Sequence, residues 1–379
     1  MHMDATIISY PDTSVVQLLS LTENRSKYML PFAGKFRVVD FVIGNAKEVD
    51  AHTIIYSNVN DDLANYVQLH GIDESRLKVV VDNFNSVDFF YSIVRDSDSA
   101  YFIIYNGDNP GIINFSHLIE RFISMKKPSV LYKMHFEENA RMAHRILVTT
   151  KKALLDTIRK ALKHNHSAPN IFEMIINMMV NIGLAKGEFS CMYWPFNTIV
   201  DYYNHNFDVI NNADYSKHVF DGHINAKLEL YRYSMLGPDA RISRSFLSDS
   251  TYINGEVVNS IIFPGVEIGK DAVVRDSIIL PYNKIGSKAR IMRTIIDERT
   301  VEPFSADIIN IGNNCKIGTT EIGMKNSDYP RVLYNSITLI GKNCIIPDGI
   351  TVGGACYIAS GKTQQDFAKQ KYIYNGTSV

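Results

Sequence analysis

The chain has 379 residues, of which 46% are hydrophobic and 21% charged, and its formal net charge is -1. This length exceeds that of a usual single domain and the composition is globular, so we expect two domains and exclude a disordered or fibrous chain. The balanced charge argues against nucleic-acid binding. No stretch is apolar over the roughly 18 residues that a membrane span needs, and no signal-peptide pattern opens the chain, so we expect a cytoplasmic protein without a membrane partner.

The cysteines are Cys191, Cys315, Cys344 and Cys356, which lie far apart in apolar contexts without a CxxC pair. This spacing predicts buried thiols and argues against disulfides or a zinc site.

Short β-rich runs alternate with helical patterns from residue 5 to about residue 150. The runs are Ala5–Ser9, Thr53–Ser57, Lys78–Val81, Tyr101–Tyr105, Ser129–Lys133 and Arg145–Thr149. This alternation predicts a doubly wound, Rossmann-like α/β domain with a parallel sheet. Residues 115–126 place Leu118, Ile119, Phe122 and Ile123 at helical spacing, which predicts a helix that packs on the sheet. Residues 151–163 and 170–182 are two further expected helices.

A repeat replaces this pattern after about residue 235. Ser260-Ile261-Ile262 recurs as Ser277-Ile278-Ile279 and as Thr294-Ile295-Ile296, and near the C-terminus an apolar residue returns every sixth position at Ile340, Ile346, Val352 and Ile358. Stacked aliphatic side chains at this period are typical of a three-sided parallel β-helix. The alternative, a β-sandwich with regular strands, explains the constant register less well.

A dense set of residues near the N-terminus has fixed spacing. The set is Leu21-Thr22, Arg25, Lys27, Pro31-Phe32, Gly34-Lys35-Phe36-Arg37 and Asp40-Phe41. It resembles the N-terminal signature of ADP-glucose pyrophosphorylases, and the order of the two domains fits that family over nearly the whole chain. The chain looks most similar to the GlgD-type subunit, which accompanies a catalytic GlgC-type subunit in some bacteria. The resemblance implies a nucleotidyltransferase domain over residues 1–230 and a left-handed parallel β-helix of hexapeptide repeats over residues 231–379.

Family enzymes convert ATP and glucose 1-phosphate to ADP-glucose and pyrophosphate in glycogen biosynthesis. Attack on the α-phosphorus requires backbone amides around the triphosphate, cations on the developing charge and carboxylates that hold Mg²⁺. The family supplies the amides from a glycine-rich loop that ends in a catalytic arginine. Here no glycine precedes Gly34, and Gln17 stands at the matching arginine position. The resemblance therefore implies that the phosphate cradle and its cation are lost.

The family's metal site is half retained. Asn106-Gly107-Asp108 resembles the segment with the first Mg²⁺-binding aspartate, and Lys27 matches a catalytic-side lysine. The second metal aspartate is replaced by Pro195, with the register set by Thr198, Asn206 and Asp208. One carboxylate rarely holds Mg²⁺ by itself, so we expect no metal site, and Asp108 is more simply read as a turn aspartate.

Arg25, Lys35 and Arg37 match positions that line the cleft for phosphorylated effectors in the family. Three cations within thirteen residues can clamp a phosphate. The alternative is a solvated loop with local ion pairs, for instance Arg37 with Asp40, and both interpretations stay open.

The sequence thus predicts a non-catalytic or impaired regulatory subunit without a cofactor of its own. It would assemble with a GlgC-type catalytic subunit, which holds the Mg²⁺, into a heterotetramer, with a sugar phosphate as candidate effector. The alternative is a weakly active sugar nucleotidyltransferase with an atypical phosphate loop. A hexapeptide acyltransferase is disfavoured, because its histidine base would lie in the β-helix and all 11 histidines lie at or before His223.

Overall fold

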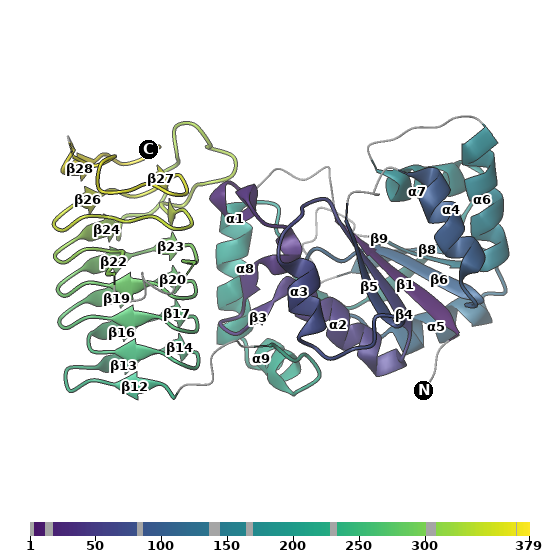
Figure 1. Ribbon diagram of the computed structural model, residues 1–379, viewed down its shortest axis with the longest axis horizontal. Coiled ribbons are helices and arrows are strands. Elements are labelled where there is room, and N and C mark those ends of the chain that lie inside the picture. The colour runs from purple at the N-terminus through teal and green to yellow at the C-terminus, as the bar shows by residue number, and fades with distance from the viewer. Residues whose placement is uncertain are drawn as a thin grey trace.

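The computed structural model describes residues 4–11, 18–81, 86–135, 145–163, 170–227, 233–300, 308–368 and 370–379. An α/β domain and a β-helix lie side by side, with α1 (Ser20–Glu23) and α8 (Ile199–Asn211) facing the β-helix (Figure 1). The expected boundary at residues 230 and 231 falls outside the described ranges and stays a prediction. None of the helices in those ranges combines the length and apolar character that a membrane crossing requires.

The α/β domain is built on a sheet with the strand order β10-β8-β9-β6-β1-β4-β5. Its strands are β1 (Ala5–Tyr10), β4 (His52–Ser57), β5 (Leu77–Val81), β6 (Tyr101–Asn106), β8 (Ser129–His135), β9 (Arg145–Thr150) and β10 (Ala185–Ser190). All six strands expected from the sequence are present. Edge strand β10 was not expected, because of its six residues only Phe189 is buried and its pattern is therefore weak.

The expected parallel direction is wrong at β9, which runs antiparallel to both β6 and β8. Only nine residues, 136–144, separate β8 from β9, and these two strands are neighbours in the sheet. A parallel crossover needs a dozen or more residues, whereas an antiparallel pair can be joined by a short connection. The length of the connection therefore fixes the direction of β9.

Helices cover both faces of the sheet. Those on one face are α2 (Val38–Val49), α3 (Leu63–Gln68) and α5 (Phe115–Ser124), and those on the other are α4 (Val87–Asp96), α6 (Lys151–Lys163) and α7 (Ile171–Asn181). On α5, the expected contacts of Leu118, Ile119 and Phe122 are confirmed by their burial. Ile123 is 51% exposed, because it lies at the border of the apolar stripe and turns away from the sheet.

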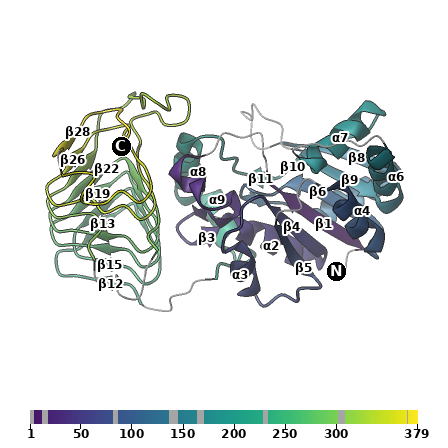
Figure 2. The ribbon, with the colours of Figure 1, turned by 45° about the horizontal axis from the view of Figure 1, so that its top comes forward.

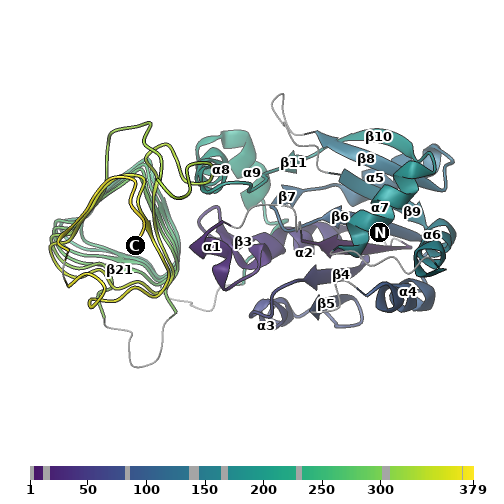
Figure 3. The same ribbon diagram turned by 90° about the horizontal axis from the view of Figure 1, so that it is seen from above.

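The C-terminal part of the chain, from β12 (Met235–Leu236) onward, is a three-sided parallel β-helix. Its coils have a triangular outline when the molecule is seen from above (Figure 3). The sequence repeat matches the coils directly, because Ile261, Ile278 and Ile295 pair with one another along β17 (Ile261–Ile262), β20 (Ile278–Ile279) and β23 (Thr294–Ile296). The fold predicted from the repeat is thus confirmed.

The two isoleucines of each repeat have different environments. Ile262, Ile279 and Ile296 belong to the core inside the β-helix. Ile261, Ile278 and Ile295 point the opposite way and pack with Trp194, Phe196 and other residues of the α/β domain. Successive side chains of a strand alternate between its two faces, so one doublet per coil serves both the β-helix core and the domain interface. Figure 1 shows β17, β20 and β23 on the side of the β-helix that faces α8, and Figure 2 shows α8 beside the β-helix in a second view.

The hydroxyl residue before each isoleucine doublet forms a ladder between coils. The Ser260 Oγ accepts a hydrogen bond from the backbone N–H of Ser277, and the Ser277 Oγ accepts one from Thr294, both at 3.1 Å. All three residues are buried, so these bonds satisfy groups that water cannot reach.

All four cysteines are free thiols. Cys315, Cys344 and Cys356 are buried in the β-helix, as expected. Cys191 is only partly buried, so the expectation of a buried thiol is not fully met at this position.

The stacked core of the β-helix yields a stability prediction. Ile279 is fully buried between Ile262 and Ile296, so Ile279→Ala leaves a cavity and should lower the free energy of unfolding by about 2–5 kcal/mol. Ile242→Ala is the matched control, since Ile242 is 38% exposed on the first coil and its loss should cost about 1 kcal/mol or less. Denaturant unfolding followed by circular dichroism measures both. Equal losses in the two variants would contradict the stacking argument.

Candidate functional site

The carboxyl ends of β1 and β6 are where an open α/β sheet usually binds its ligand, because the strand order reverses between them. Here the backbone carbonyl of Tyr10 accepts hydrogen bonds from the N–H of Gly107 and from the side-chain amide of Asn106, each at 3.3 Å. The two strand ends are thus tied together directly. Gln17 lies outside the described residues, so the loss of the family arginine stays a prediction.

Asp108 and Lys27, two positions singled out in the sequence analysis, form a buried ion pair. The Lys27 Nζ lies 3.6 Å from the Asp108 Oδ1 and 2.9 Å from the Asn109 Oδ1. The side chain of Asp108 is 1% exposed and that of Lys27 is 10% exposed. The carboxylate therefore already has a cation beside it, held in a position with little access to water.

Pro195 lies beside this pair. Strand β11 (Met192–Tyr193) runs antiparallel to β7 (Gly111–Ile112), which follows Asp108 in the chain. The next residues continue the contact, because the Trp194 N–H donates to the Pro110 carbonyl at 2.9 Å and the Phe196 N–H donates to the Asn109 Oδ1 at 2.7 Å. The fold thus brings position 195 next to the Asp108 segment, and the proline there offers no metal ligand.

These residues do not fit a Mg²⁺ site. Mg²⁺ is usually held by one or two carboxylates that are free to bind it, but Asp108 is paired with Lys27 and Pro195 has no side-chain oxygen. Across the described ranges, no group of three His, Cys, Asp or Glu side chains could hold a metal. Burial raises the pKa of Tyr28 and of Tyr193 well above the ordinary value, and the charge of Asp108 raises both further, so these phenols stay neutral.

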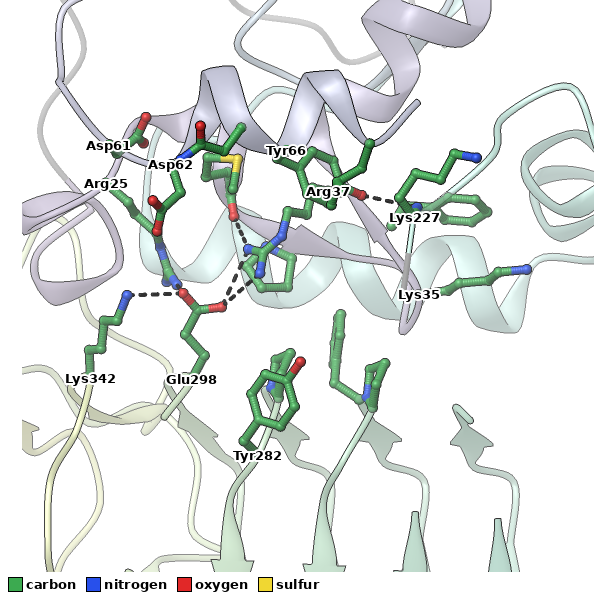
Figure 4. A pocket seen from close by; sticks show the side chains of 18 of the residues that line it. Arg25, Lys35, Arg37, Asp61, Asp62, Tyr66, Lys227, Tyr282, Glu298 and Lys342 are labelled. Atoms are coloured by element: carbon green, nitrogen blue, oxygen red, sulfur yellow. Dashed lines mark hydrogen bonds and ion pairs between the residues drawn. The ribbon is translucent and has the colours of Figure 1, made fainter. Parts of the chain in front are cut away.

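A second site lies between the domains, in a cavity of about 430 Å³. Arg25, Lys35 and Arg37 line it from the α/β domain. Glu298 and Lys342 line it from the β-helix, and Figure 4 shows the cations around Glu298. Two distant parts of the sequence therefore meet in one charged cleft.

Glu298 is the centre of this charged cluster. Its carboxylate lies 2.8 Å from Arg25 Nη1 and 3.3 Å from Arg37 Nη2. Lys342 Nζ is 3.1 Å away on the third side. Arg25 also forms a 2.6 Å ion pair with Asp297, whose side chain is fully buried. Burial acts to raise the pKa of Glu298, but Arg37, Arg25 and Lys342 outweigh it and hold that pKa far below its ordinary value.

The structure separates the three candidate effector residues. Arg25 and Arg37 share Glu298, whereas Lys35 is exposed and lies toward the other end of the cavity, pointing away from Glu298 (Figure 4). The alternative of a solvated loop does not hold for Arg25, which is 4% exposed. The suggested side-chain pair of Arg37 with Asp40 is also absent from the observed contacts: the backbone N–H of Arg37 donates to Asp40, while the guanidinium reaches Glu298 and the Met29 carbonyl.

Sequence reasoning missed Asp297, Glu298 and Lys342. A signal for the first two was present in the repeat, where the doublet is followed by Phe263-Pro264 and Leu280-Pro281 in two coils and by Asp297-Glu298 in the next. Charge replaces an apolar pair at one register position, on the face that looks toward the α/β domain. Lys342 has no comparable signal.

Comparison with known proteins agrees with this architecture. Residues 234–326 match the model of the GlmU-like C-terminal hexapeptide family. The glucose-1-phosphate adenylyltransferase of Acetivibrio thermocellus is 22% identical over 92% of this chain and 91% of its own length. That of Pseudothermotoga lettingae is 24% identical over 93% of each chain. The chain is therefore similar to glucose-1-phosphate adenylyltransferases over most of its length. A Desulforamulus reducens enzyme of this name is 32% identical over 32% of the chain.

The charged cluster yields a prediction about stability. Arg25→Ala leaves Asp297 buried without its partner, and breaking a buried pair in this way costs about 3–5 kcal/mol. The matched control is Arg76→Ala, because Arg76 pairs with Asp50 but is 43% exposed, where such a pair contributes about 0–1 kcal/mol. Urea unfolding of both variants measures the difference. A loss at Arg25 no larger than that at Arg76 would show that the cluster does not stabilise the fold.

Proposed function

We propose that the chain is a non-catalytic or catalytically impaired regulatory subunit of glucose-1-phosphate adenylyltransferase. The relatives named glucose-1-phosphate adenylyltransferase, which are similar over most of this chain, support a role in glycogen synthesis. The observation that supports the finer assignment is the state of the family's metal position: Lys27 neutralises Asp108 and Pro195 stands where the second carboxylate is expected. Phosphoryl-transfer catalysis depends on positioning and charge stabilisation, and these residues supply neither.

We further propose that the chain acts on a GlgC-type catalytic subunit within a heterotetramer. Similarity extends over most of the length of the relatives, and both domains are folded against each other through a shared apolar core. A fold retained around an unsuitable active site is consistent with a role in coupling between subunits. Mg²⁺ would then belong to the catalytic partner.

The interdomain cavity is the proposed place of a sugar-phosphate effector. Arg25, Arg37 and Lys342 converge there, and charge-assisted contacts of this kind suit a phosphate. Lys35 and Lys227 line the same cavity and could contact the rest of such a ligand.

We expect turnover at background when the isolated chain is assayed with ATP, Mg²⁺ and glucose 1-phosphate. Loss of even one preorganised electrostatic group costs about a hundredfold or more, and several are absent together. The variant Pro195→Asp should also stay at background, because groups that act as a unit contribute far from additively and Lys27 would still neutralise Asp108.

A catalytically active homologue, assayed in parallel, is the control for these measurements. Robust ADP-glucose formation by the wild-type chain would favour the alternative, a weakly active enzyme with an atypical phosphate loop. Activity of Pro195→Asp at roughly a hundredth of the homologue's rate would show that the substrate sites are intact.

We expect the chain to co-elute with a catalytic homologue from the same source and to change its rate or effector response. The physical reason is that a bound subunit can alter another only through a coupling free energy, typically about 1–3 kcal/mol. Size-exclusion chromatography and kinetics of the mixture measure both effects. Separate elution with unchanged kinetics would exclude the partner role.

A further inference from the structure

Three cations surround one carboxylate in the wall of the interdomain cavity. The Glu298 carboxylate oxygens lie 2.8 Å from Arg25 Nη1, 3.3 Å from Arg37 Nη2 and 3.1 Å from Lys342 Nζ. Arginine binds carboxylate and phosphate oxygens with the same donor geometry, so a site that holds one of these groups can hold the other. The position that an anionic ligand would take is therefore filled by a side chain of the protein itself.

The charges of the cluster favour exchange with a phosphate. Arg25, Arg37 and Lys342 oppose the carboxylates of Asp297 and Glu298, which leaves one positive charge in excess. A phosphate group carries about 1.5 to 2 negative charges near neutral pH. With the displaced Glu298 carboxylate away from the cations, a phosphate in its place would balance the three cations and Asp297, whereas the bound Glu298 leaves one positive charge in excess.

Glu298 and Asp297 differ in how they are held. Asp297 is fully buried and its Oδ1 is bound by Arg25 and by the Glu298 backbone N–H at 2.6 Å each. The Glu298 side chain is 11% exposed, follows the end of β23 and borders the 430 Å³ cavity. Its carboxylate can therefore turn into the cavity without disturbing the coil, while Asp297 stays as a fixed counter-ion of Arg25.

We propose that Glu298 is an internal ligand that occupies the anion-binding position of Arg25, Arg37 and Lys342, so that a phosphorylated ligand binds this cavity only by displacing it. This role rests on the proposed effector function of the cavity and specifies how that site is regulated. It also connects binding to domain position. Glu298 and Lys342 belong to the β-helix, whereas Arg37 directly precedes α2 of the α/β domain. When a ligand displaces Glu298, the ion pairs of Glu298 with Arg25 and Arg37 are lost, and the ligand contacts both domains in their place.

The test measures binding of inorganic phosphate to the isolated full-length chain by isothermal titration calorimetry. Glu298→Gln removes the competing charge and should bind phosphate about tenfold tighter or more than the wild type, since freed cations gain a partner. Glu298→Asp keeps the charge but shortens the side chain, and it should give an intermediate affinity. Glu267→Gln is the matched control, because Glu267 pairs with Lys284 on the outside of the β-helix at 2.8 Å and should leave phosphate binding unchanged.

Lys342→Met in the Glu298→Gln background should reverse much of the gain, which ties the binding to this cluster. Equal phosphate affinity in the wild type, Glu298→Gln and Glu298→Asp would overturn the proposal. Should Glu298→Gln fail to fold, Glu298→Asp against Glu267→Gln decides by itself. The assay contains no catalytic subunit, so its failure would leave the non-catalytic role intact, and turnover by the isolated chain would leave the phosphate result unaffected.

Discussion

The arrangement of the molecule depends on one apolar contact, the packing of a β-helix face against the α/β domain. The outward isoleucines of three coils lie in the same core as Trp194, Phe196 and residues of α8. Burial of large apolar side chains contributes about 1.5–3 kcal/mol each, so this face holds the domains more firmly than polar contacts could. Two polar bonds align it: the Tyr203 hydroxyl donates to the Asp276 carbonyl at 2.7 Å and the Ile199 N–H donates to the Val332 carbonyl at 3.1 Å. The charged cluster around Glu298 requires this alignment.

The two polar sites of the chain have opposite characters. Around Asp108, the carboxylate is paired with Lys27 of its own domain, and hydrogen bonds tie the ends of β1 and β6 together. Around Glu298, the charges come from different domains and border a cavity. Arg37 extends this second network, because Asp40 accepts from its backbone N–H and from Tyr66, and Tyr66 accepts from the Lys227 N–H near the connection to the β-helix.

Much of the fold could be predicted from the sequence, because local periodicity reports which side chains are buried. The strands of the sheet followed from short β-rich runs, and the coils followed from the recurring isoleucine doublet and the six-residue apolar spacing. The direction of β9 could not be read from its residues, since a buried strand has the same composition in either direction. The isoleucine doublet was recognised as a repeat, but its second function at the domain interface depends on a partner surface that no local pattern encodes.

The two candidate sites also differ in how much of each could be predicted from the sequence. Lys27, Asp108 and Pro195 were found through resemblance, and the structure places them together. Arg25 and Arg37 were recognised as cations, but their counter-ions lie more than 250 residues away in the chain. The fold alone brings these groups together, so the sequence shows the cations without the carboxylates that pair with them.

The regular stacking of the coils determines where the acidic pair lies relative to the arginines. Phe263-Pro264, Leu280-Pro281 and Asp297-Glu298 occupy one register position on successive coils, and neighbouring strands are spaced about 4.8 Å apart. An acidic pair moved by one coil would shift by this whole step, which exceeds the tolerance of ion pairs as short as 2.6 and 2.8 Å. An acidic pair on this scaffold can therefore be placed only in steps of one coil. It lies either opposite the arginines or a full coil away from them.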